Sequence, residues 1–182
     1  MATPPVFVAN TVLTAAQMNQ VGMWRISNDT TPGTATTFTK DDVFTSDFRH
    51  YRLYVSGSTA TAGNCTLQLR ASGTAATTNY AWNQVLRDLS GTTNTVTSSG
   101  GTTSSVRLGL LNTGALGAAS SFVVDILDPQ ITTPTMFFSM NVYTSTAAYS
   151  LFGTHYAALS YDGFTLTGAG NLNVNVELFG LN

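Results

Sequence analysis

The two histidines, His50 and His155, are the residues of this chain from which acid–base chemistry at neutral pH would most readily start. His155 follows Ser150 and precedes Asp162, which are the residue types of a hydrolytic triad. However, the sequence has no Gly-x-Ser-x-Gly elbow to present the serine. His50 lies three residues after Asp47, and residues three apart on a strand point to opposite faces. We therefore predict two hydrogen-bonded strand histidines, no catalytic residue and no enzyme.

The carboxylates and the single cysteine indicate no second kind of chemistry. Glu177 is the only glutamate, and the aspartates are scattered, so that no pair is singled out for glycoside hydrolysis. No loop gathers enough Asp or Asn for a calcium site. Cys65 lacks a partner for an internal disulfide and lies in an alternating run typical of a buried strand residue. We expect neither a metal nor a cofactor.

Aromatic residues beside Asn and Thr offer one possible ligand surface. Tyr80, Trp82 and Tyr149 are candidates for contact with a glycan, because an aromatic ring suits the apolar face of a pyranose and neighbouring amides suit its hydroxyls. Packing in the core is the more frequent role of aromatic residues at alternating positions.

The composition argues against nucleic acid and membranes as partners. Charged residues make up only 9% of the chain and the net charge is -2, which gives no basic surface for nucleic acid. The segment from Pro129 to Tyr161 has no Asp, Glu, Lys or Arg, but Pro134 and Gly153 interrupt it, so we expect no insertion into a membrane. The N-terminus lacks the pattern of a signal peptide, which predicts that the protein is not secreted through a leader of its own.

Residues 1–22 differ from the rest of the chain and are predicted to form an arm with one short helix. Thr14 and Gln17 fit a capping box, while Leu13 and Met18 fit the hydrophobic staple around it. A helix of two turns is not stable alone. We therefore predict that Leu13, Thr14, Gln17 and Met18 anchor the chain to its own domain or to a neighbouring subunit.

From residue 23 to residue 182 the hydrophobic period is two, which predicts one all-β domain. Nine or ten short strands separated by Gly, Ser, Thr and Asn favour an antiparallel β-sandwich of jelly-roll type. The candidate strands are Met23–Ser27, Phe48–Ser56, Thr66–Ala71, Tyr80–Leu86, Val106–Leu110, Phe122–Leu127, Met136–Tyr143, Tyr149–Leu159, Phe164–Thr167 and Leu172–Phe179.

Two of these strands carry large side chains on both faces. Tyr51, Leu53 and Val55 alternate with Phe48, His50, Arg52 and Tyr54, and Met136, Phe138, Met140 and Val142 alternate with Phe137 and Tyr143. An exposed sandwich strand should have one solvated face. The pattern predicts that another subunit, the N-terminal arm or a folded-over loop covers one sheet. The low-complexity segment 89–105 is expected to be either a surface loop or a hairpin formed against a partner.

Several stretches together resemble small structural proteins of tailed bacteriophage particles, of the minor tail, fibre and decoration type. They are Val12–Asn19, Asp42–Leu53, Leu67–Gly73, Thr78–Tyr80, Tyr161–Leu166, Gly170–Leu172 and Val176–Gly180.

The resemblance implies a β-rich module on the surface of the phage particle, at the tail or the capsid, that forms a homotrimer and contacts other particle proteins. It transfers no catalytic residue. A tail-fibre or tail-tip subunit that meets the host surface is the first hypothesis, and a capsid decoration protein is the second. A carbohydrate-binding module, with a host glycan as ligand, is the third.

Overall fold

The computed structural model describes residues 22–89, 91, 94–113, 120–144 and 147–181, and every regular element in these residues is a β-strand. The strands are β1 (Met23–Thr30), β2 (Thr37–Lys40), β3 (His50–Thr59), β4 (Gly63–Ala71), β5 (Thr74–Ala75), β6 (Tyr80–Asp88), β7 (Asn94–Thr103), β8 (Val106–Leu111), β9 (Ser120–Leu127), β10 (Thr135–Thr144), β11 (Ala147–His155), β12 (Gly163–Thr167) and β13 (Leu172–Leu181).

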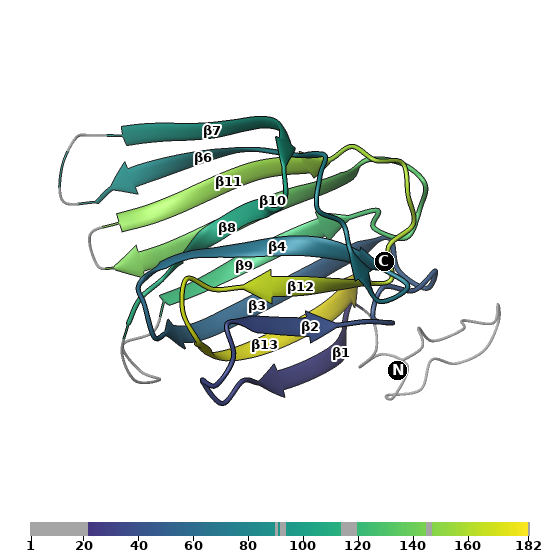
Figure 1. The fold of residues 1–182 in the computed structure, drawn as a ribbon, viewed down its shortest axis with the longest axis horizontal. Helices are drawn as coiled ribbons and strands as arrows, with labels where there is room; N and C mark the ends of the chain where they lie inside the picture. The colour runs from purple at the N-terminus through teal and green to yellow at the C-terminus, as the bar shows by residue number, and fades with distance from the viewer. Residues whose placement is uncertain (1–21, 90, 92–93, 114–119, 145–146, 182) are drawn as a thin grey trace.

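The strands form two antiparallel sheets that lie one over the other (Figure 1). The larger sheet has eight strands in the order β1-β13-β3-β9-β10-β11-β6-β7. The smaller sheet has the order β2-β12-β4-β5, and β8 pairs with β4. The prediction of an all-β, antiparallel sandwich is confirmed in these residues.

Alternation along the strands fills the space between the sheets. In β13, Leu172, Val174, Val176 and Leu178 are buried, whereas the residues between them are only partly buried. β4 contributes Cys65, Leu67 and Leu69 from the opposite sheet to the same core. Because side chains alternate between the two faces of a strand, each sheet presents one apolar face to the other.

The segment 89–105 contains a strand rather than a surface loop. β7 pairs with β6 over a register that runs from Tyr80 with Thr103 to Arg87 with Asn94. The low-complexity sequence therefore completes the edge of the larger sheet within its own chain. β2 and β5, the other strands that the sequence did not predict, have four and two residues and are too short for a clear alternation.

Phe48 was predicted to begin a strand and to share one of its faces with His50, Arg52 and Tyr54, and this was wrong. β3 begins only at His50, and the Phe48 side chain is 1% exposed within the core. Its ring packs against Trp24 at 5.7 Å and Tyr51 at 6.0 Å between ring centroids. Gly180 on β13 leaves the space that this ring occupies.

The predicted helix and the anchoring residues Leu13, Thr14, Gln17 and Met18 lie outside the described residues. Among the residues that are described, no helix has the length and apolar character needed to cross a membrane.

Candidate functional site: the outer face of the larger sheet

The outer face is the surface of the eight-stranded sheet that points away from the smaller sheet, and its most apolar strand is β10. Met136, Phe138, Met140 and Val142 point outward and are all exposed, with Met140 the most exposed at 73%. Phe137, Ser139 and Asn141 point inward and are buried. The prediction that this strand carries bulk on both sides is confirmed, and nothing in the described residues covers its outer side.

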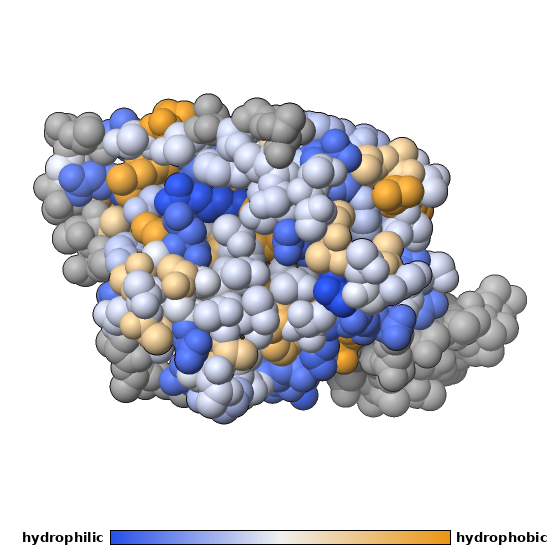
Figure 2. Space-filling model, in the orientation of Figure 1, coloured by the Kyte–Doolittle hydropathy of each residue, from blue (hydrophilic) through white to orange (hydrophobic). Residues whose placement is uncertain are grey.

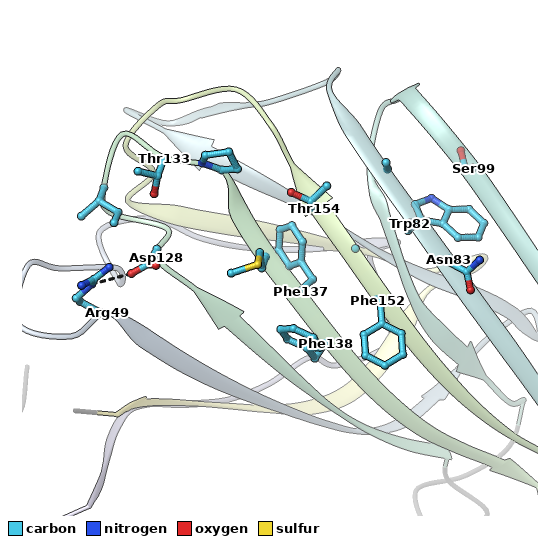
Figure 3. Close-up of a pocket in the computed structure, with 15 residues that line it drawn as sticks. Arg49, Trp82, Asn83, Ser99, Asp128, Thr133, Phe137, Phe138, Phe152 and Thr154 are labelled. Atoms are coloured by element: carbon cyan, nitrogen blue, oxygen red, sulfur yellow. Dashed lines mark hydrogen bonds and ion pairs between the residues drawn. The ribbon is translucent and has the colours of Figure 1, made fainter.

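The neighbouring strands extend the apolar surface. Phe138 is paired across the sheet with Phe152 of β11, which is also exposed. The two rings meet edge to face, with 5.5 Å between their centroids, and lie side by side in Figure 3. On β9, Val123 is paired with Met140. Exposed aromatic and methionine side chains of this kind are enriched in protein interfaces.

Two hollows run along this surface and share Phe138. One has a volume of about 870 Å³ and is lined by Met136, Phe138 and Phe152, with Arg49 and Asp128 at one end (Figure 3). The other has a volume of about 520 Å³, and Met140 and Val142 line it together with residues of β3 and β9. We call the two together the groove.

The charged side chains beside the groove are paired within the chain. Arg52 Nε and Nη2 donate to the two carboxylate oxygens of Asp125 at 2.6 and 2.8 Å, and His50 Nε2 lies 3.2 Å from Asp125 Oδ1. At the end of the groove, Arg49 Nε donates to Asp128 Oδ1 at 2.7 Å. Desolvation alone would raise the pKa of Asp125, but the hydrogen bonds and charge of Arg52, with a smaller effect of His50, hold that pKa below its ordinary value.

Ser150, His155 and Asp162, which have the residue types of a hydrolytic triad, do not meet. Ser150 is paired with Met140 and points outward, whereas His155 is paired with the buried Thr135 and points into the core. His155 Nδ1 lies 3.1 Å from the Tyr161 hydroxyl, and burial lowers the pKa of the imidazole. Asp162 instead accepts a hydrogen bond from the backbone N–H of Ser72.

The three candidates for glycan contact all lie on the inner side of the larger sheet. Tyr80 is fully buried, and its ring packs against His155 at 4.3 Å between centroids. Trp82 is paired with Gly153 in the row of the buried Phe137, and the guanidinium of Arg107 lies 5.8 Å from the centre of its ring. Tyr149 is paired with the buried Asn141. The structure therefore does not gather these three rings into one exposed platform.

Other potentially reactive groups are separate from the groove. Cys65 is completely buried, and this raises the pKa of its thiol to about 12. Within the described ranges, no three His, Cys, Asp or Glu side chains gather into a group that could hold a metal ion. Local sequence patterns do not indicate the Arg52–Asp125 pair, because its partners are 73 residues apart. The only sequence signal for Phe152 is the alternation of side chains along its own strand.

The smaller sheet presents a different kind of surface. In the orientation of Figure 2, hydrophilic and neutral residues cover most of the visible face, and apolar residues are isolated on it. Its outward side chains include Thr39 and Thr165, whose hydroxyls lie 3.1 Å apart, and Arg70, which pairs with Asp41 at 2.6 Å. The exposed large apolar side chains of β10 and β11 are therefore a property of the larger sheet.

Comparison with models of protein families, with curated proteins and with solved structures found no match to this chain.

Proposed function

We propose that this chain is a structural protein of a bacteriophage particle that works as a homo-oligomer, most simply a trimer of the tail-fibre or tail-tip type. The observation that carries the proposal is the outer face of the larger sheet, where β10 alone exposes Met136, Phe138, Met140 and Val142. Contiguous exposed apolar surface on a soluble domain typically marks a contact with another protein. In an assembly, such a surface would be buried against a neighbouring subunit.

The arrangement of the stretches that resemble phage structural proteins supports the class. Backbone N–H groups of Val43 and Phe44 donate to the Asp162 carbonyl at 2.8 and 2.9 Å. The Asp162 N–H donates to the carbonyl of Arg70, and its side chain accepts from Ser72. Three stretches that are far apart in the sequence therefore meet at one place. The resemblance covers one packed unit of the domain, consistent with a shared module, and we propose jelly-roll connectivity for it.

Light scattering on the purified chain tests the oligomer. We expect the mass of three chains at micromolar concentration, and a monomer at every accessible concentration would contradict the proposal. Electron microscopy of particles labelled with an antibody against this chain tests the placement. Label at the tail supports the first form of the proposal, whereas label over the shell assigns the chain to capsid decoration. Particles that carry no label would contradict both.

A further inference from the structure

The size of the outer face is the first argument about its occupant. The apolar positions of β10 extend over six residue steps from Met136 to Val142, and six strand spacings separate β13 from β7. With ~3.3 Å per residue and ~4.8 Å between strands, the flat area is about 600 Å² before the relief of the side chains is counted. This is the area of the whole face, charged side chains included, and one partner's share of a stable interface runs from about 600 to about 1,000 Å². The face is therefore at the lower end of the size that a stable protein contact needs.

The charges on the face are compatible with an identical partner. Arg52 and Asp125 neutralise one another in the middle of the sheet, and Arg49 and Asp128 do the same at its end. Outside the apolar centre, the register places Arg25, Arg87 and Glu177 on the same face. The face therefore carries charges of both signs, which does not favour a strongly acidic or a strongly basic partner over a second copy.

The chemistry of the centre and its surroundings matches a subunit interface. The centre consists of methionine, phenylalanine and valine. Methionine fills irregular gaps, and methionine and phenylalanine are enriched in protein interfaces. Around it lie the small polar residues Ser121 and Asn83, both exposed. An apolar centre with a polar rim is the usual anatomy of a protein–protein interface.

We propose that copies of this chain associate through the outer face of the larger sheet, with β10 at the centre of the contact. The inference rests on the homo-oligomer proposed above and adds the surface that forms it. Among the described residues, Met140 has the most exposed of the large apolar side chains, and its counterpart in a second copy would come within reach of it.

A disulfide between copies tests this arrangement directly. The variant Met140→Cys places a thiol at the centre of the face, while the native Cys65 is fully buried and does not compete. Thr37→Cys is the matched control, because Thr37 is exposed on β2 of the other sheet. Under mild oxidation we expect covalent dimers from Met140→Cys and few from Thr37→Cys. In a closed trimer one thiol of three stays unpaired, so coupling should stop near two-thirds of the chains.

Insertion of a charge provides an independent readout. Met140→Glu places like charges opposite one another at the centre of the contact, and we expect its mass by light scattering to fall to that of one chain. Thr37→Glu should keep the wild-type mass, and circular dichroism should show the same β signal for both variants. A Met140→Glu protein that keeps the wild-type mass, or equal cross-linking of the two cysteine variants, would overturn the proposal.

The wild-type mass separates failure of this inference from failure of the proposed function. A monomeric wild type contradicts the oligomer itself, whereas an oligomer unaffected by both changes at Met140 contradicts only the surface. Residues 1–21 are the competing occupant. If the thiol of Met140→Cys resists a thiol reagent in a monomer and becomes reactive when residues 1–21 are deleted, the face is covered by the chain's own arm and the inference is wrong.

Discussion

Gly180 is the position at which a single methyl group should have a large effect on stability. A Cβ atom at this residue would lie 2.4 Å from two carbons of the Phe48 ring, far inside van der Waals contact. The ring has little room to retreat, because Phe48 is 1% exposed and packs against Trp24 and Tyr51. Overpacking of a core costs typically 1–3 kcal/mol, and the rigid, buried ring places this site at the upper end. We expect Gly180→Ala to lower the free energy of unfolding by about 3 kcal/mol.

The assay is urea unfolding followed by tryptophan fluorescence, with all variants at one protomer concentration, since association would contribute to the apparent stability. A double-mutant cycle identifies the cause. Phe48→Leu alone should cost about 2 kcal/mol through lost apolar burial. In the double variant the smaller side chain relieves the crowding, so the loss should fall short of the sum of the single losses by about 2 kcal/mol. An unchanged stability of Gly180→Ala, or strictly additive losses, would refute the reasoning.

Three further predictions concern titrating groups. Because the folded pKa of Asp125 is lowered, its stabilising contribution is present above the unfolded pKa of about 3.9 and is lost as the pH falls through the folded value. Between pH 6 and 2, the free energy of unfolding should therefore depend less on pH in Asp125→Asn than in wild type. Parallel plots of the free energy of unfolding against pH would contradict this. Burial lowers the pKa of His155, so wild type should lose stability as the pH falls from about 6.5 towards 5, whereas His155→Gln should not; an equal loss in both proteins would count against it. With its pKa raised to about 12 by complete burial, Cys65 should react with a thiol reagent only after unfolding in urea, and rapid labelling of the folded protein would disprove the burial.

The fold class followed from local patterns. Alternation of apolar and polar residues is a property of consecutive positions, so the sequence indicated β13, β4 and β10 without knowledge of their partners. The sequence also predicts large side chains on both faces of β10, since Phe137 and Phe138 are neighbours and must point in opposite directions. The exposed apolar face is the structural counterpart of that pattern.

Contacts between distant parts of the chain decided which face is inside. Tyr80 and Trp82 are two residues apart and share one side of β6, but only the smaller sheet packed over that side turns them inward. Likewise, Phe48 lies in the core because Gly180, on a strand at the other end of the sequence, leaves room for its ring. The 94–103 segment forms a strand because β6 offers it an edge to pair with.

The sequence by itself determined that this is an antiparallel β protein with few charges and at least one strand apolar on both sides. The tertiary structure alone decided that the second apolar side is an open surface on the larger sheet, with Arg52 and Asp125 paired beside its groove. The physical reason is that the periodicity of a strand shows only which side chains share one of its faces and that an apolar face packs against something. Whether the packing partner belongs to the same domain depends on how sheets pack, which no local pattern contains.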